Sequence, residues 1–522
     1  MTLTNVSFLL FAAVLLAVYY CVPKKLQWVL LLVGSWVFYL AAGWRYLIFM
    51  GITTLTTYAS SRIMGGRLQK QEAYLAENKA TLSREDKKAY KARVKSGNRI
   101  WLIACLLINF GMLFVCKAAL IQPVRELMQG GSLGFLTLGL PMGISFYLFQ
   151  SMGYCIDVYR GTVKAEKCFF RLALFVSFFP QLVQGPISKF SQLAPQLCGE
   201  HRFDGGTVAF GLQRMLWGYF KKLVIADRIA VAVGMLKAPA LGGMGFFLLT
   251  LFYAVQLYAD FTGGMDIAIG LSEAMGIRLT ENFQRPFFSK NIAEYWRRWH
   301  ISLGEWMKDY IFYPISVSQP MLKLSKAGRK RLGNFGKRLP VYIASVATWF
   351  VTGIWHGLSA NFILWGMLNC FFIVLSEECQ PLYAKFHGKF HLKEKGWYGI
   401  FEMLRMFLLM NLIRACDLFP KVGDYFTGLA SMFTKPNFRI LADGTLMQLG
   451  LSELDYGILI FGIVLMIGVS LFQEKRGGVR EGMRQLPDPV RYALVFTLFA
   501  VVLLMGSYGI GFDASSFIYN QF

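Results

Sequence analysis

Two histidines are the residues of this chain whose type and position could do chemistry. His300 lies in Tyr295-Trp-Arg-Arg-Trp-His-Ile-Ser-Leu303, and His356 in Thr352-Gly-Ile-Trp-His-Gly-Leu358, where it interrupts an apolar run of membrane-spanning type. An ionisable side chain at membrane depth is costly, which makes it a candidate functional residue by default. A neutral imidazole is also suited to accept and return a proton near pH 7. We therefore expect the chemistry to be built around these two residues.

The spacing around His356 predicts a position inside the bilayer. His356 lies fifteen positions after Val341, which corresponds to about 22 Å of helix. Gly353 and Gly357 flank the histidine and leave the backbone open to close approach by a ligand or another helix. The alternative is a packed histidine bonded to a neighbouring helix, but a functional role is favoured at this depth.

The segment around His300 has a different pattern. Asn291–Pro314 is weakly apolar and rich in Trp, Arg, Lys and Tyr, and Trp296, Trp299, Leu303 and Trp306 recur at helical spacing. This pattern predicts an amphipathic helix that is interfacial or re-entrant near the cytoplasmic face. Periodicity alone explains the histidine equally well as part of an aromatic belt.

An acidic pair lies in the segment Gln256-Leu-Tyr-Ala-Asp-Phe-Thr-Gly-Gly-Met-Asp266. Asp260 ends an apolar run, and Asp266 follows in what reads as a glycine-rich turn. These carboxylates could orient a histidine or cap the start of a helix, and capping is the favoured interpretation.

The composition identifies the class of protein to which these residues belong. Of 522 residues, 55% are hydrophobic and 16% are charged, against roughly a quarter charged in soluble chains. The net charge of +24 arises from basic residues clustered between apolar runs, which is the positive-inside pattern of membrane proteins. Nucleic-acid binding is therefore excluded. The nine cysteines form no C-x-x-C pair, so we expect no metal site.

Apolar runs of spanning length recur along the whole chain. The expected spans are Asn5–Val22, Leu26–Gly43, Trp44–Met64, Ile100–Ile121, Leu133–Ile156, Gly245–Phe261, Val341–Leu358, Asn361–Ser376, Trp397–Ala415, Tyr456–Phe472 and Tyr492–Ile510. Residues 168–236 should hold two or three more. This pattern predicts an all-α polytopic membrane protein of about 11 transmembrane helices plus re-entrant or interfacial helices, in a single domain over residues 1–522.

Charge in the connecting segments predicts the orientation. Gly65–Arg99 carries ten Lys and Arg against four Asp and Glu, which favours the cytoplasmic side. The loops Lys323–Arg338, Lys385–Lys395 and Lys475–Arg491 are also basic, whereas Asp417–Asp455 is balanced to acidic. Counting spans from these loops predicts that both termini are extracytoplasmic.

Several segments, taken together, resemble the membrane-bound O-acyltransferase (MBOAT) family, in particular its bacterial alginate O-acetyltransferase-like branch. The most specific segments are Glu281–Leu303, Trp306–Tyr310 and Gly353–Gly357. Further matching segments are Leu140–Tyr147, Ile156–Gly161, Phe178–Ile187, Gln256–Gly270 and Phe517–Phe522. One departure is Asn411-Leu-Ile-Arg-Ala415, where the family often has a Trp-Val-Phe-Phe-Arg-Ala-like stretch.

The resemblance implies a fold and a set of site residues. It implies a ring of helices around a funnel, with His356 at the constriction as general base and His300 as the second catalytic histidine. Arg297, Arg298 and the basic loops would attract an anionic thioester donor. We expect this donor to be acetyl-CoA, and we expect neither a cofactor nor a metal ion. The residues expected to support the donor or the structure are Arg297, Arg298, Trp299, Asp309, Trp355, Asp260 and Asp266.

The implied reaction is transfer of an acyl group from a cytoplasmic thioester to an extracytoplasmic polysaccharide or cell-wall polymer. The transfer would be direct or through a secreted partner similar to SGNH hydrolases, in a bacterial plasma membrane. The D-alanyl transferases of teichoic acid modification share the His300 block and are the first alternative. They rank second because of this chain's length, the Lys323–Arg338 insertion and the sequence Leu358–Gly366. A transporter or flippase is disfavoured because no internal repeat is evident.

Overall fold

The computed structural model describes residues 2–129, 140–238, 241–508 and Phe517. Contacts group the chain into two compact units, one of Met1–Gly211 with Leu271–Thr280 and one of Leu212–Gly270 with Glu281–Phe522. Within the described ranges the regular elements are helices, apart from an isolated bridge between Phe283 and Trp299. The all-α class is therefore confirmed, whereas the single domain over residues 1–522 stays a prediction.

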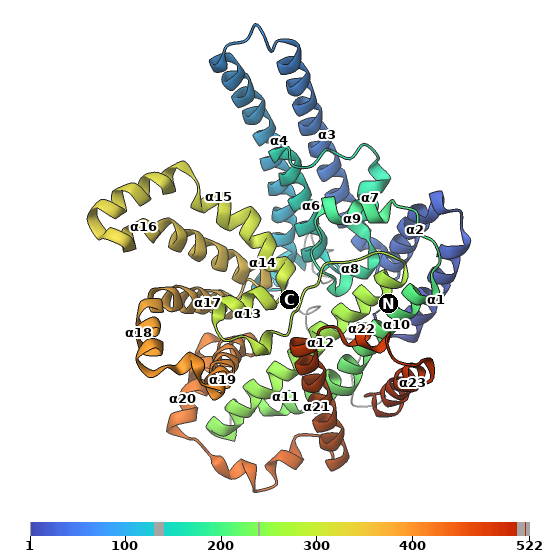
Figure 1. Ribbon diagram of the computed structural model, residues 1–522, viewed down its shortest axis with the longest axis vertical. Coiled ribbons are helices and arrows are strands. Elements are labelled where there is room, and N and C mark those ends of the chain that lie inside the picture. Colours follow the sequence, from blue (N-terminus) through green and yellow to red (C-terminus); the bar gives the residue numbers. More distant parts are fainter. Residues whose placement is uncertain (1, 130–139, 239–240, 509–516, 518–522) are drawn as a thin grey trace. The chain divides into compact units, whose positions relative to one another are not determined.

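The first unit is built around a long helical hairpin. Its helices are α1 (Val6–Cys21), α2 (Gln27–Leu40), α3 (Leu47–Glu77), α4 (Arg84–Ala118), α5 (Gln122–Gln129), α6 (Ile144–Arg160), α7 (Phe169–Ser177), α8 (Phe179–Gln184) and α9 (Phe190–Leu197). The hairpin consists of α3 and α4, which lie side by side (Figure 1), and α6 packs against both. Helix α10 (Gly205–Tyr219) runs from this unit into the second.

The hairpin corrects one expectation about the basic segment Gly65–Arg99, which is largely helical and not a loop. Helix α3 has 31 residues, or about 46 Å of length, against roughly 30 Å of bilayer hydrocarbon. Its charged end therefore continues beyond the length that a membrane would cover. Helix α4 begins after Ser83, whose hydroxyl oxygen accepts a hydrogen bond from the backbone N–H of Asp86 at 3.0 Å and so satisfies an otherwise unpaired donor.

The second unit carries both histidines. Its elements include the π-helical η4 (Phe220–Ala226), α11 (Asp227–Leu236), α12 (Gly242–Ala274), α13 (Ile292–Arg298), α14 (Ile301–Met307), the π-helical η7 (Lys308–Phe312), α15 (Tyr313–Ser316), α16 (Gln319–His356), α17 (Ala360–Glu378), α18 (Gln380–Phe390), α19 (Gly396–Arg414), η9 (Ala415–Leu418), α20 (Val422–Thr434), α21 (Glu453–Arg476), α22 (Val479–Met483) and α23 (Asp488–Met505). The last residues of α12 belong to the first unit. Helix α16 packs along α17, and α21 and α23 pack against η4.

Helix α16 also departs from expectation, because the basic segment Lys323–Arg338 is a helical hairpin and not a loop. The helix reverses at Gly333, which has φ 56° and ψ −132°, a conformation that glycine adopts without steric cost. The two arms touch at Gly328 and Gly336, where a Cβ atom on Gly328 would lie 2.6 Å from the carbonyl oxygen of Gly336. Figure 1 shows the resulting fold-back of α16.

Five helices in the described part of the chain are long and apolar enough to cross a membrane, namely α4, α12, α17, α21 and α23. They coincide with expected spans, as do the shorter apolar helices α1 and α2. The start of the expected span Leu133–Ile156, the end of Tyr492–Ile510 and residues 518–522 lie outside the described residues. The chain is a multi-pass helical membrane protein, while the count of about 11 crossings and the orientation of the termini stay predictions.

The predicted orientation can be tested with single cysteines on exposed side chains. We expect Lys91→Cys and Lys330→Cys to react only with reagents that reach the cytoplasm, and Leu441→Cys to react from outside. All three native side chains are exposed, whereas the neighbouring Ile440 is 2% exposed and unsuited to labelling. Maleimide labelling of intact and permeabilised cells, in a background without the exposed Cys21, measures this. Labelling of position 91 from outside would overturn the orientation.

Candidate functional site

His300 lies at a break between two short helices. The single amphipathic helix expected over Asn291–Pro314 is wrong, because α13 ends at Arg298 and α14 starts at Ile301. His300 has φ 48° and ψ 52°, the left-handed region, which is uncommon for a residue other than glycine. Such a conformation persists only when surrounding contacts impose it, and it is concentrated at functional sites. The break turns His300 into the interior, where it is 2% exposed.

Asn282 is the residue that imposes this position. Its Oδ1 atom accepts hydrogen bonds from the backbone N–H of Ser302 at 3.0 Å and from the Ser302 hydroxyl at 2.9 Å. Its backbone carbonyl accepts from the N–H of Ile301 at 3.0 Å. The Nδ2 atom of Asn282 lies 3.3 Å from Nδ1 of His300. One buried side chain therefore holds both the backbone after His300 and the orientation of its ring.

His356 is the last residue of α16. The expected span Val341–Leu358 therefore does not continue through the histidine, because the chain turns after it and α17 begins at Ala360. The two helices approach closely, since a Cβ atom on Gly353 would lie 2.6 Å from the carbonyl oxygen of Phe362. The open backbone predicted around His356 is thus occupied by a neighbouring helix. His356 is 9% exposed.

The indole of Trp355 contacts both histidines. Its ring centroid lies 5.9 Å from that of His300 and 4.8 Å from that of His356. Trp365 of α17 contacts His356 from another direction at 4.8 Å, and Phe261 of α12 contacts His300 at 5.0 Å. The two catalytic candidates from separate sequence blocks therefore belong to one buried aromatic cluster, while the supporting role of Trp355 stays a prediction.

Arg414 is a site residue that sequence reasoning missed. Its guanidinium carbon lies 3.9 Å from the ring centroid of Trp299, a distance for a strong cation–π contact. Its Nη2 group donates a hydrogen bond to the Tyr295 hydroxyl at 2.9 Å, and Tyr295 in turn stacks on Trp299. The available signal was an arginine at the end of an apolar run. The chain departs from the family pattern around Arg414, but the arginine itself is present.

The environment of His300 decides its charge. Burial, together with the positive charge of Arg414, lowers the pKa of His300 to about 3, so the ring is neutral at physiological pH. His300 Nδ1 lies 3.3 Å from Nδ2 and 3.4 Å from Oδ1 of Asn282. Because Oδ1 already accepts two hydrogen bonds from Ser302, we take Nδ2 as the donor to Nδ1, which places the proton of the neutral ring on Nε2. His300 can then offer a hydrogen bond from Nε2 but cannot act as a cationic acid. Asp417 lies in η9, close to Arg414 at the end of α19. Burial raises the pKa of the Asp417 carboxyl to about 7, and the positive charge of Arg414 opposes this shift.

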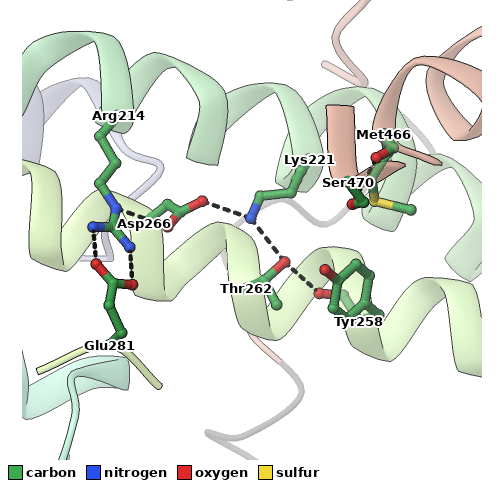
Figure 2. Close-up of polar contacts among 8 residues, drawn as sticks. All are labelled: Arg214, Lys221, Tyr258, Thr262, Asp266, Glu281, Met466 and Ser470. Atoms are coloured by element: carbon green, nitrogen blue, oxygen red, sulfur yellow. Dashed lines mark hydrogen bonds and ion pairs between the residues drawn. The ribbon is translucent and has the colours of Figure 1, made fainter. Parts of the chain in front are cut away.

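Asp260 and Asp266 form ion pairs with cations that precede α12 in the chain. Both lie within α12 and not at a helix start, because the helix continues through the glycines between them. Asp266 accepts from Arg214 at 2.9 Å and from Lys221 at 2.7 Å (Figure 2), while Asp260 pairs with Lys222 at 2.8 Å. Capping of a helix start is therefore wrong for this pair, whereas a role in orienting a histidine stays a prediction. The two carboxylates join α12 to the segment before it.

Three of the remaining predicted residues have simpler surroundings. Arg298 pairs with Glu294 of α13 at 2.8 Å and with Glu474 of α21 at 3.0 Å, so its guanidinium connects these two helices. Arg297 is exposed, and Asp309 is half-buried in η7. Among the described residues no group of three His, Cys, Asp or Glu side chains gathers as metal ligands do.

The fold and the site define a class, a multi-pass helical membrane protein with two buried histidines in one aromatic cluster. The profile of MBOAT, the membrane-bound O-acyltransferase family, matches residues 168–328 and 330–418, which include both histidines. Probable alginate O-acetylases of Pseudomonas aeruginosa and Pseudomonas syringae are 33% and 31% identical, over 85% and 72% of this chain. The chain spans 79% and 65% of their respective lengths.

A peptidoglycan O-acetyltransferase of Helicobacter pylori is similar at 31% identity over 58% of this chain and 59% of its own length. With a relative above 30% identity along most of both chains, the family assignment is secure. The chain belongs to the membrane-bound O-acyltransferase family, and its class is that of membrane acyltransferases.

The role of Asn282 leads to a prediction. We expect Asn282→Ala to lower acyl transfer about 10²-fold, because a small misplacement of a reacting group carries a cost of that order. Ser302→Ala is the matched control. This variant loses the hydroxyl but keeps the hydrogen bond from the backbone N–H of residue 302 to Asn282, so we expect the variant to retain most activity. Alkali-labile acyl groups released from envelope and secreted polymers, at equal protein abundance, measure both. Wild-type transfer by Asn282→Ala would show that the amide does not hold His300 in place.

Proposed function

We propose that this chain moves an acyl group, namely acetyl, from a cytoplasmic thioester donor to a hydroxyl group of an extracytoplasmic polysaccharide or cell-wall polymer. The acceptor is reached directly or through a secreted partner similar to SGNH hydrolases. The observation that carries the proposal is that both histidines contact the indole of Trp355, in a buried cluster of aromatic rings. The names of the alginate and peptidoglycan relatives support the acetyl group and the polymeric acceptor.

In this proposal His356 is the general base. The proton of the acceptor hydroxyl passes to its imidazole as the hydroxyl oxygen bonds to the thioester carbonyl carbon. The carbon–sulfur bond then breaks, and the departing thiolate takes the proton back from His356. Burial at 9% exposure favours this cycle because excluded water cannot compete with the hydroxyl for the acyl carbon.

His300 and Arg414 supply the electrostatics of the same step. Negative charge develops on the carbonyl oxygen of the donor during attack, and donors or cations aimed at that oxygen lower the barrier. A neutral His300 that carries its proton on Nε2 is such a donor. Arg414, held by Trp299 and Tyr295, contributes a permanent positive charge nearby. His300 would thus act on the thioester donor.

The central test is the loss of the general base. We expect His356→Ala to insert normally and to lower acyl transfer by about 10²- to 10⁴-fold, the usual contribution of a general base. His391→Ala is the control, because the His391 side chain is 72% exposed and has no role in the proposed step. Mass analysis of envelope and secreted polymers from cells with equal protein abundance measures the outcome. Near-wild-type acylation by His356→Ala would refute the assignment.

The identity of the donor is tested by binding. The hairpin of α16 exposes Lys326, Arg329, Lys330 and Arg331, which would attract a donor that bears phosphates, with a strength that salt reduces. We expect purified protein to bind acetyl-CoA in a salt-sensitive way, and neutralising these four residues together to weaken that binding. Calorimetric titration at two salt concentrations is the measurement.

The control for this experiment removes the same amount of charge elsewhere. Lys88, Lys91, Arg93 and Lys95 are exposed on α4, and neutralising them should leave acetyl-CoA binding unchanged. Equal binding by the α16 variant and wild type would mean that the hairpin serves only as an orientation signal. Failure of wild type to bind acetyl-CoA, with acceptance of a D-alanyl carrier protein, would replace acetyl transfer by D-alanyl transfer.

A further inference from the structure

A surface cavity of about 520 Å³ lies in the first unit, between the start of α2 and the loop that joins α6 to α7. Three cations line it, Lys164, Lys167 and Arg171, together with the indole of Trp28. The guanidinium carbon of Arg171 lies 5.7 Å from the Trp28 ring centroid, within the range of a cation–π contact. A ligand in this cavity would therefore contact both cationic side chains and an aromatic ring.

The one carboxylate of the lining does not cancel this charge at close range. Glu166 Oε1 accepts hydrogen bonds from the backbone N–H groups of Lys167 at 2.8 Å and Cys168 at 2.9 Å. Its negative charge is therefore directed at the backbone of its own loop. No ion pair is recorded for Lys164, Lys167 or Arg171 among the described residues.

The loop is fixed in place by contacts with α3 and α6, so the cavity is preformed. The hydroxyl of Tyr58 donates to the carbonyl oxygen of Lys167 at 2.8 Å, and the backbone N–H of Glu166 donates to the hydroxyl of Tyr154 at 2.8 Å. Ala165 packs against Gly65 of α3, where a Cβ atom on the glycine would lie 2.5 Å from the Ala165 methyl carbon. A preformed site loses little conformational entropy when it binds.

The surroundings of the cavity have the character of a membrane boundary. Leu26 and Phe170, which are close in sequence to the lining residues Trp28 and Arg171, are each 52% exposed, and the exposed Lys24 and Lys25 precede α2. The predicted orientation, with an extracytoplasmic N-terminus and a first span at Asn5–Val22, puts residues 23–26 on the cytoplasmic side. The contact of Ala165 with Gly65 puts the loop 161–168 beside the basic hairpin, which is predicted to lie on the same side. Tryptophan and lysine gather at this level of membrane proteins.

We propose that this cavity binds the phosphate-bearing headgroup of an anionic phospholipid of the cytoplasmic leaflet. The phosphate would lie among the three cations, the glycerol region against Trp28, and the acyl chains along the exposed apolar side chains. Basic pockets between membrane helices on the cytoplasmic side recognise headgroups of this kind. The site is independent of the proposed acyl transfer, because it uses none of the residues around the histidines.

The test is native mass spectrometry of the full chain in neutral detergent, titrated with phosphatidylglycerol, phosphatidylcholine or coenzyme A. We expect wild type to retain phosphatidylglycerol in preference to phosphatidylcholine. The triple variant Lys164→Gln, Lys167→Gln, Arg171→Gln should bind phosphatidylglycerol at least about ten-fold more weakly. The matched control Lys88→Gln, Lys91→Gln, Lys95→Gln removes the same charge from the exposed part of α4 and should bind like wild type.

Three outcomes would overturn the proposal. Equal phosphatidylglycerol binding by the triple variant and wild type would show that the cavity is not the site. An equal loss in the α4 control would show that only total charge matters. Binding of coenzyme A, but not of phosphatidylglycerol, that depends on the three cations would assign the phosphate to a soluble ligand. Size-exclusion profiles and tryptophan fluorescence report folding, and Trp28→Leu, which keeps all three cations, should also weaken lipid binding.

Discussion

Buried ion pairs between η4 and α12 are the interaction on which the second unit depends. Lys221 and Lys222 are consecutive residues of one π-helical segment, and they pair with Asp266 and Asp260 of α12. A buried charge without its partner is strongly destabilising, commonly by several kcal/mol, so these pairs allow one register between the two segments. Figure 2 shows the pair of Lys221 with Asp266. Phe261 follows Asp260 directly and contacts His300. The ion pairs thus fix the position of the α12 segment against which His300 packs.

The two histidines are positioned by different physical means. His300 depends on a strained backbone and on Asn282, whose bonds to the following residues maintain the left-handed conformation. His356 depends on helix termination and on the close approach of α17, which requires glycine at position 353. The indole of Trp355 contacts both imidazoles. The two helix breaks therefore share one packing partner.

The apolar runs, the two histidines and the family segments were readable from the sequence because each depends on local composition or on a short motif. Helices formed where apolar runs predicted spans, as at α1, α17 and α21. The same reasoning failed for basic segments, since charge was taken to indicate loops. Lysine and arginine are good helix formers, and α3, α4 and α16 continue through them. Charge patterning reports the side of the membrane and does not report secondary structure.

The sequence by itself determined the class of the protein, the family to which it belongs and the two residues around which a reaction would be built. Only the tertiary structure decided which side chains surround them. Arg414 reaches Trp299 and Tyr295 from more than a hundred positions away, and Asp260 and Asp266 pair with lysines of η4. The physical reason is that a buried charge must take whichever opposite charge or aromatic face the packing of helices brings within a few ångströms. These contacts form between separate segments of the chain, so no local sequence pattern predicts them.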